Sequence, residues 1–143
     1  MTQVTLLAAD VLETLARDLL SAAGASGSEA EIVAEHLVTS SLLGHDSHGI
    51  LRLPEYLGLV EEGSIVPGAE ITVERRSVTS AVVDCGLGFG PVGGVRAIET
   101  AIELATESGT GCVVTRRCNH VARLGAYVQL AAERGLVALA TCN

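Results

Sequence analysis

The chain has 143 residues, of which 48% are hydrophobic and only 18% are charged, and its formal net charge is −8 at pH 7. An acidic chain with one Phe, two Tyr, no Trp and no basic stripe argues against nucleic acid as a partner. All nine basic residues are Arg, so chemistry that needs a lysine, such as a Schiff base, cannot come from this chain.

Helical periodicity predicts three helices in the first half of the chain. Over 4–22, four apolar residues form one stripe at helical spacing: Leu7, Val11, Leu15 and Leu19. Ser28 and Glu31 predict a capping box at the start of a second helix, which ends near Gly44. Its predicted inward face consists of Ile32, Val33, His36, Leu37, Ser40 and Leu43. A third helix is predicted from Ile50 to Glu62, where a glycine follows.

The hydrophobic period changes after the turn-rich linker 64–68, where we place a boundary between a helical domain, 1–68, and an α/β domain, 69–143. Alternating apolar residues predict an antiparallel pair of strands at 70–76 and 79–85. The elements predicted next are a helix at 91–107, a strand at 111–115, a helix at 124–134 and a strand at 136–141. The expected fold is α/β (α+β), with an N-terminal helical layer followed by a β-β-α-β-α-β two-layer sandwich.

Residues Gly88–Gly93 match the dinucleotide-binding pattern G-x-G-x-x-G between a strand and a helix. Three features argue against a Rossmann loop. The strand before it looks like half of a hairpin, Arg116 and Arg117 stand where a ribose-binding acidic residue is needed, and Pro91 removes one amide. We therefore favour a glycine-rich turn that packs helix on strand; the Rossmann alternative would predict NADP.

Two polar clusters, 44–52 and 116–120, each stand at a junction between predicted elements. Polar groups are costly to bury unless they bind something, so we hypothesise that both clusters face one active site. His48 and His120 are the acid/base candidates, because imidazole titrates near neutral pH. The second cluster has a plainer alternative, a turn with an exposed histidine. His36 lies on an apolar helix face and is interpreted as a core histidine with one backbone partner.

Arg52 follows His48 by one helical turn, and its guanidinium matches a carboxylate bidentately. Ser47 is a donor to a cofactor or a helix cap, and capping is the favoured role of Asp46. A metal site built from His45 and His48 is disfavoured, because such closely spaced residues rarely converge on one ion. No metal is therefore expected.

The cysteines Cys85, Cys112, Cys118 and Cys142 have no C-x-x-C spacing and are interpreted as reduced thiols of a cytoplasmic protein. The N-terminus lacks the basic region of a signal peptide, and no apolar run is long enough to span a membrane. The low charge predicts that a second subunit or further chain covers part of the apolar surface.

Several short motifs occur in order along nearly the whole chain. They are Asp46-Ser47-His48-Gly49 with Arg52 and Tyr56, Glu62-Gly63-Ser64-Ile65, Val83-Asp84, Asn119-His120 with Gly125 and Tyr127, Ala131-Ala132-Glu133-Arg134-Gly135-Leu136, and Thr141-Cys142-Asn143. In order and spacing they resemble the malate/L-lactate dehydrogenase family of the non-Rossmann type, which includes ureidoglycolate, sulfolactate and diketogulonate oxidoreductases. The Asp-Ser-His-Gly and Asn-His motifs are the specific part of this resemblance.

The resemblance implies hydride transfer between NAD or NADP and a small 2-hydroxy or 2-oxo acid, in a homodimer. It makes His120 the acid/base that exchanges a proton with the substrate oxygen, with His48 as the second catalytic candidate. Arg52 would bind the substrate carboxylate. Ser47 and His48 would hold nicotinamide or substrate, and Asn119 would contact the cofactor.

The chain departs from the family in two respects. Many members have Phe-Gly after the histidine, whereas this chain has Val121-Ala122 followed by Arg123, which we expect to bind substrate and influence which acid is accepted. Members are also much longer and carry an active-site lysine beyond the point where this chain stops. We therefore expect an N-terminal portion with little activity alone. The alternative from another class is a non-catalytic binding or dimerisation module.

Overall fold

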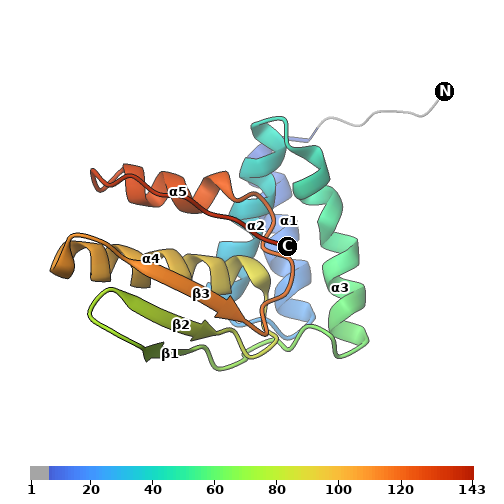
Figure 1. Cartoon of the computed structure of the whole chain (residues 1–143). Coiled ribbons are helices and arrows are strands. Elements are labelled where there is room, and N and C mark those ends of the chain that lie inside the picture. Colours follow the sequence, from blue (N-terminus) through green and yellow to red (C-terminus); the bar gives the residue numbers. More distant parts are fainter. Residues whose placement is uncertain (1–6) are drawn as a thin grey trace.

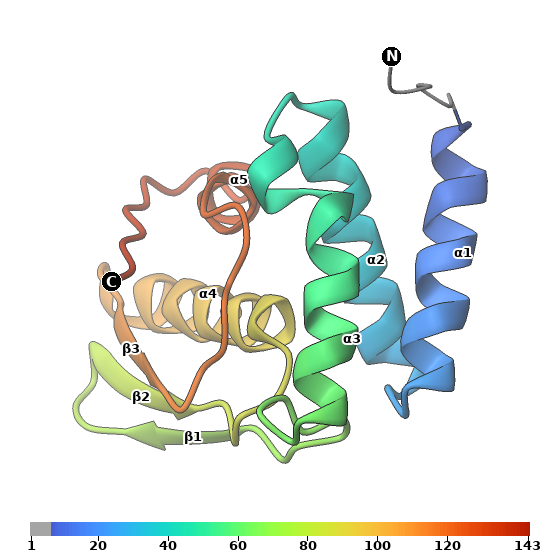
Figure 2. The ribbon, with the colours of Figure 1, turned by 90° about the vertical axis from the view of Figure 1, so that its right-hand side faces the viewer.

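The computed structural model describes residues 7–143, which form two layers that pack against each other (Figure 1). The first layer is helical, and it contains α1 (Ala9–Ala22), α2 (Gly27–Leu42) and α3 (Leu53–Glu61). Two short 3₁₀ turns, Asp46–His48 and Ile50–Arg52, connect α2 to α3. Figure 2 shows the three helices side by side, with the second layer on the side away from α1.

The second layer is a three-stranded sheet with two helices. Its elements are β1 (Thr72–Arg75), β2 (Ser80–Asp84), α4 (Gly90–Ser108), β3 (Cys112–Arg116) and α5 (Gly125–Ala132). β1 and β2 form the expected antiparallel pair, and β3 joins β2 in parallel, giving the order β1-β2-β3. Helix α4 makes the crossover between the parallel strands and covers one face of the sheet (Figure 1). The predicted fold class, α/β without a Rossmann sheet, is confirmed.

The strand predicted over 136–141 is not formed. This segment has no strand conformation, and Val137 and Leu139 are almost fully exposed. An apolar, β-branched run favours an extended backbone, but a strand also needs a neighbour that accepts and donates ladder hydrogen bonds. Within the described residues no strand pairs with the outer edge of β3, which therefore stays open.

The capping box of α2 lies two residues before the predicted one. The Ser26 hydroxyl accepts a hydrogen bond from the Glu29 amide at 3.3 Å, and the Glu29 carboxylate accepts one from the Ser26 amide at 2.8 Å. The prediction of Ser28 and Glu31 was wrong because both sequences fit the capping pattern and the helix starts at the earlier one. Glu29 also accepts the amide of Gly68 at 3.0 Å, so the cap ties α2 to the linker before β1.

The apolar stripe of α1 faces away from the core. Its members are 40–54% exposed: Leu7, which precedes α1, and Val11, Leu15 and Leu19 within the helix. Helix α1 instead packs on α2 through Ala16 and Leu20, which are fully buried. Of the helix predicted over 4–22, residues 4–6 lie outside the described part of the chain.

One cluster of buried residues extends across the predicted boundary at 68–69. It joins residues of the helical layer with Ile65, Phe89 and Ala122. The division into two domains stays a prediction. In residues 7–143, no helix combines the length and the apolar character needed to cross a bilayer.

The cap gives a direct test of how α2 begins. Ser26→Ala removes the hydroxyl that satisfies the Glu29 amide, so the free energy of unfolding should fall by about 1 kcal/mol. Ser28→Ala is the matched control, because Ser28 stands inside the first turn, and it should change stability by less than about 0.5 kcal/mol. Urea denaturation followed by circular dichroism measures both. Equal effects of the two substitutions would contradict the assignment of the cap.

Candidate active site

The polar junction after α2 is shaped by close contact between backbones. Gly44 has a φ of +78°, the left-handed conformation that commonly ends a helix. Gly49 lies against Ser41 of α2, where any Cβ would overlap the serine hydroxyl. That hydroxyl accepts the Ile50 amide at 3.0 Å. The junction is therefore held against α2 at a defined place, with its polar side chains directed away from the core.

His48 and His120 are brought together although 72 positions separate them in the sequence. Their ring centroids lie 5.3 Å apart with an interplanar angle of 31°. Tyr56 of α3 holds the second ring, because its hydroxyl lies 3.0 Å from Nδ1 of His120 and donates to the His120 carbonyl at 3.1 Å. The two clusters predicted to face one site therefore meet at these two imidazoles.

The Tyr56 contact defines which nitrogen of His120 is available. A hydroxyl has one proton, so in the arrangement in which Tyr56 donates it to the carbonyl, Nδ1 of His120 carries the ring proton and donates to the hydroxyl oxygen. The neutral ring then keeps its lone pair on Nε2. Burial, the Arg52 charge and the neighbouring His48 lower the pKa of His120, which favours this neutral form. Burial raises the pKa of Tyr56, so the phenol stays protonated.

Arg52 and Ser47 complete the first cluster. The Arg52 guanidinium donates through Nε to the Ser47 carbonyl at 2.7 Å and pairs with Glu55 at 2.6 Å, while its side chain is 33% exposed. The Ser47 hydroxyl lies 2.9 Å from Nδ1 of His48. The expected capping role of Asp46 is not observed, because α3 begins at Leu53 without any side-chain cap.

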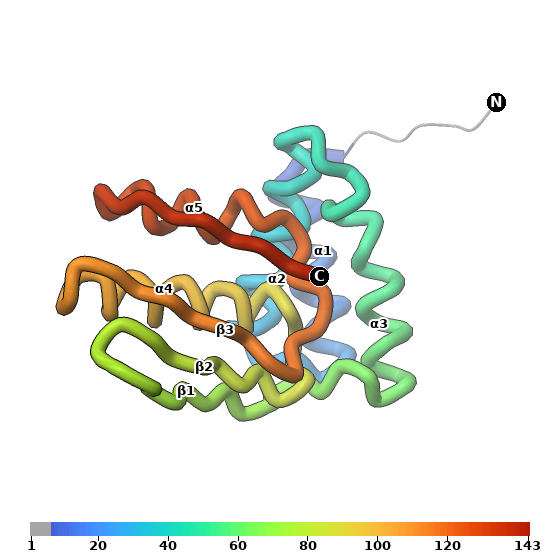
Figure 3. Tube along the Cα trace, viewed as in Figure 1, coloured from blue at the N-terminus to red at the C-terminus, as the bar shows by residue number. Residues whose placement is uncertain are grey.

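The loop after β3 reaches this site because it rests on the start of α4. A Cβ on Gly90 would overlap the carbonyl oxygens of Asn119 and His120. The Asn119 amide nitrogen donates to the carbonyls of Ser64, Leu87 and Gly88, at 3.1, 2.8 and 3.1 Å. Figure 3 shows the trace passing from β3 across the first turn of α4 toward the helical layer. The interpretation of the glycine-rich segment as a packing turn is confirmed.

Arg116 and Arg117 do not join the two imidazoles. Both pair with Asp84 at the end of β2, at 2.8 and 2.7 Å, and both are more than half exposed. Arg117 and the Gly86 amide hold the pKa of Asp84 at about 2. The two arginines therefore tie the ends of the parallel strands together, and only the last residues of the second cluster reach the site.

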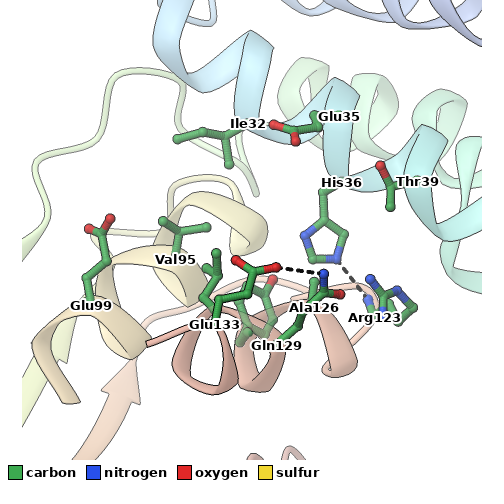
Figure 4. Close-up of a pocket in the computed structure, with 12 residues that line it drawn as sticks. Ile32, Glu35, His36, Thr39, Val95, Glu99, Arg123, Ala126, Gln129 and Glu133 are labelled. Atoms are coloured by element: carbon green, nitrogen blue, oxygen red, sulfur yellow. Dashed lines mark hydrogen bonds between the residues drawn. The ribbon is translucent and has the colours of Figure 1, made fainter. Parts of the chain in front are cut away.

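His36 is the core histidine that the sequence suggested. Its Nε2 accepts the Arg123 amide at 3.2 Å, and its ring lies 5.2 Å from that of Tyr127. It lines a cavity of about 360 Å³ between α2, α4 and α5, which Figure 4 shows with Glu35, Glu99 and Arg123 around it. This cavity is lined by neither His48 nor His120.

A second, open cavity of about 310 Å³ adjoins His48. It is lined by His45, the loop segment 122–125 and Cys142. Arg123 lines both cavities, and its buried Nε has no hydrogen-bond partner among the described residues. Over residues 7–143, no three His, Cys, Asp or Glu side chains are grouped closely enough to hold a metal ion.

Comparison with known proteins identifies the family of this chain. The family model described as malate/L-lactate dehydrogenase matches residues 7–143. The chain belongs to this family. The membership expected from the Asp-Ser-His-Gly and Asn-His motifs is thus confirmed.

Individual members resemble the chain in sequence and in structure. The (2R)-3-sulfolactate dehydrogenase (NADP⁺) of Chromohalobacter salexigens is 39% identical over 132 residues, which cover 92% of this chain and 39% of the relative. The L-sulfolactate dehydrogenase of Methanocaldococcus jannaschii is 36% identical over 88% of this chain and 37% of its own length. The solved malate dehydrogenase of Pyrococcus horikoshii OT3 matches with a TM-score of 0.87 and 34% identity, over 90% of this chain and 37% of that one. The chain therefore spans less than two fifths of the length of these family members.

Two residues that shape the site were not among the predicted functional residues. Tyr56 contacts His120, and its position four residues after Arg52 was a usable signal, because that spacing places both on one face of a helix. Ser41 positions the junction through Gly49 and Ile50. It had no signal in the sequence, since a serine inside a helix is common and its partner lies outside the helix.

The contact at Gly90 predicts a position-specific effect on stability. Gly90→Ala forces the loop at 119–120 away from α4, which should lower the free energy of unfolding by about 1–3 kcal/mol. Gly27→Ala is the matched control. Gly27 is also the first residue of a helix, but no atom lies within 4 Å of its Cβ position, so stability should change by less than about 0.5 kcal/mol. Urea unfolding of both variants measures the difference, and a Gly90→Ala chain as stable as the control would contradict the contact.

The lowered pKa of His36 predicts that the folded protein loses stability in mild acid. Burial and the Arg123 charge lower the pKa of His36 from 6.5 to about 4. Between these two pH values the unfolded chain binds a proton that the folded chain does not, so stability falls as the pH falls from 6.5 to 4. The contribution of this one group should be on the order of 2–3 kcal/mol.

The pH dependence of the free energy of unfolding measures this contribution, and the readout is the slope rather than the absolute stability. His36→Gln should flatten the slope over this range. His45→Gln, which alters an exposed histidine, should leave the slope unchanged. An unchanged slope in the His36 variant would show that this imidazole does not control the acid sensitivity.

Proposed function

We propose that this chain forms part of the active site of an NAD(P)-dependent dehydrogenase that acts on small 2-hydroxy or 2-oxo acids. The observation that carries the proposal is the pair of imidazoles, with the Tyr56 hydroxyl 3.0 Å from Nδ1 of His120, so that Nε2 is the nitrogen left for substrate. Membership in the malate/L-lactate dehydrogenase family supports it. As a proposal for the whole protein, it includes the homodimer and the cytoplasmic location expected from the sequence.

His120 is the proposed acid/base. In the direction of oxidation, Nε2 accepts the proton of the substrate hydroxyl while Nδ1 keeps its hydrogen bond to Tyr56. In reduction the imidazolium returns this proton to the substrate oxygen. A bound nicotinamide nucleotide supplies the hydride acceptor or donor for the neighbouring carbon. The lowered pKa of His120 suits the role of a base at neutral pH.

Arg52 is the proposed anchor for the substrate carboxylate. Its guanidinium is one third exposed and already holds one carboxylate, that of Glu55, so a substrate would take over an existing interaction rather than create a new charge site. Arg123 is the proposed second contact to substrate. It lines the open cavity beside His48, and its Nε has no hydrogen-bond partner among the described residues.

The polar groups present fit a nicotinamide nucleotide at this junction rather than at the glycine-rich turn. Residues 119–120 cover the start of α4, where a Rossmann loop would bind the pyrophosphate. Ser47 and His48 offer a hydroxyl and an imidazole next to the open cavity and are the proposed cofactor contacts. Asn119, the third, has its amide nitrogen engaged with backbone carbonyls, so it can offer only its side-chain oxygen.

Kinetics of the His120 variant test the proposal. Oxidation of NADH and NADPH is followed with oxaloacetate, pyruvate and sulfopyruvate, on this chain and on the longest reading frame that contains it. We expect the longer protein to turn over at least one of these acids, and the 143-residue chain to show little activity, since it spans less than two fifths of its relatives. His120→Ala should lower kcat by at least about 100-fold.

The control is Arg76→Ala, which removes an exposed side chain that pairs with Glu74 beside the β1–β2 hairpin, away from both imidazoles, and should leave kcat within about twofold. Circular dichroism verifies that both variants are folded. If His120→Ala reacts like the unmodified protein, His120 is not the acid/base. If no reading frame binds either nucleotide, the non-catalytic dimerisation module becomes the better account, with the exposed stripe of α1 as its contact surface.

A further inference from the structure

Cys85 and Cys118 lie just beyond the ends of the two parallel strands, at the same edge of the sheet. β2 and β3 run parallel, with Asp84 paired to Arg116. Cys85 stands one residue beyond this pair on the first strand, and Cys118 stands two residues beyond it on the second. The Cys85 amide donates to the Arg116 carbonyl at 3.0 Å, so the backbones of the two segments are joined where the cysteines begin.

The two thiols fill the same space over α4. A Cβ on Gly93 would lie 2.6 Å from the Cys85 sulfur and 3.0 Å from the Cys118 sulfur. Both sulfurs therefore border one point that only a glycine leaves empty. Thiols that border the same point are placed to close a disulfide, which requires their two Cβ atoms to come within about 3.5–4.5 Å.

The two thiols differ in access and in acidity. Cys85 is fully buried, whereas Cys118 is half-buried. The neighbouring Cys118 thiol and burial raise the pKa of Cys85, while the Cys85 thiol lowers the pKa of Cys118. Cys118 is thus the thiol that a small oxidant meets first and the one that more readily becomes a thiolate, the reactive form.

We propose that Cys85 and Cys118 are a site of reversible oxidation that closes to a disulfide beside the proposed acid/base His120. A peroxide oxidises the Cys118 thiolate to a sulfenic acid, and one peroxide oxygen leaves as water. The Cys85 sulfur then attacks the Cys118 sulfur, the S–O bond breaks, and the released hydroxide takes up the Cys85 proton. In total, two thiols and one hydrogen peroxide give one disulfide and two waters.

The cross-link would join the end of β2 to the loop that carries His120. Cys118 stands two residues before this histidine, and its thiol contacts the Gly90 carbonyl at 4.0 Å. The oxidised pair would thus restrain the same loop that the Gly90 contact positions. The proposal does not depend on the dehydrogenase activity, because the thiols and the oxidant are sufficient for the reaction.

Thiol counting and mass spectrometry test the pair. The Cys112→Ser/Cys142→Ser chain keeps only Cys85 and Cys118. After hydrogen peroxide it should lose both free thiols together, its intact mass should fall by the two hydrogens, and it should remain a monomer on a non-reducing gel. A digest should contain one cross-linked peptide joining the two cysteines, and dithiothreitol should restore both thiols.

Cys118→Ser in the same background is the matched control, and its single thiol at Cys85 should survive the treatment because it is buried. The peroxide dose is chosen as one that oxidises the exposed Cys112 of the unmodified chain. The proposal is overturned if a dose that oxidises Cys112 leaves Cys118 as a free thiol. It is equally overturned if Cys118 proceeds to sulfinic acid while Cys85 stays reduced, since the sulfurs then do not meet.

Discussion

The site depends on one close contact between backbones, that of residues 119–120 with Gly90. Without a side chain on Gly90, the carbonyls of Asn119 and His120 lie directly on the first turn of α4. The Asn119 amide then holds the loop to the linker and to the glycine-rich turn. From this position His120 reaches Tyr56 and His48 of the helical layer. The glycine-rich turn and the loop that carries His120 therefore contact each other directly at Gly90.

The polar residues near the sheet separate into two groups with different roles. Asp84 forms ion pairs with both Arg116 and Arg117, so one carboxylate binds two cations at the ends of the parallel strands. Among residues 7–143 neither imidazole forms an ion pair, and burial together with the Arg52 charge lowers the pKa of His120 and favours its neutral form. The ion pairs of Asp84 thus hold the strand ends together, whereas the two imidazoles lie at the site with Arg52 and Glu55.

Local features of the fold were predictable from the sequence because they depend on near neighbours. The β1–β2 hairpin follows from its alternation, α4 ends at Gly109 with a φ of +82°, and His36 lies on a buried helix face as its position suggested. The meeting of His48 with His120 followed from their chemistry together with the family motifs. Their assigned roles, like the boundary at 68–69, stay predictions.

The failures have a common physical cause, which is dependence on distant partners. The cap of α2 could begin at Ser26 or at Ser28 on pattern alone, and contact with Gly68 accompanies the earlier choice. The run at 136–141 has strand character but no neighbour to pair with among the described residues. Helical periodicity identified the apolar stripe of α1, but it does not show which face of the helix contacts α2. That contact is made by Ala16 and Leu20, outside the stripe.

The hydrogen bond between Tyr56 and His120 spans 64 positions of the sequence, which bears on when the site can form. The α1–α2 pair and the β1–β2 hairpin are made of contacts between neighbours in the chain, and such contacts close at little entropic cost. The imidazole pair instead joins residues 72 positions apart, so it closes a far longer loop. A nascent chain that has left the ribosome only as far as Arg116 therefore contains every helix of the first layer and the whole sheet, yet has no His120. The site is complete only once the loop after β3 lies on α4 and contacts α3.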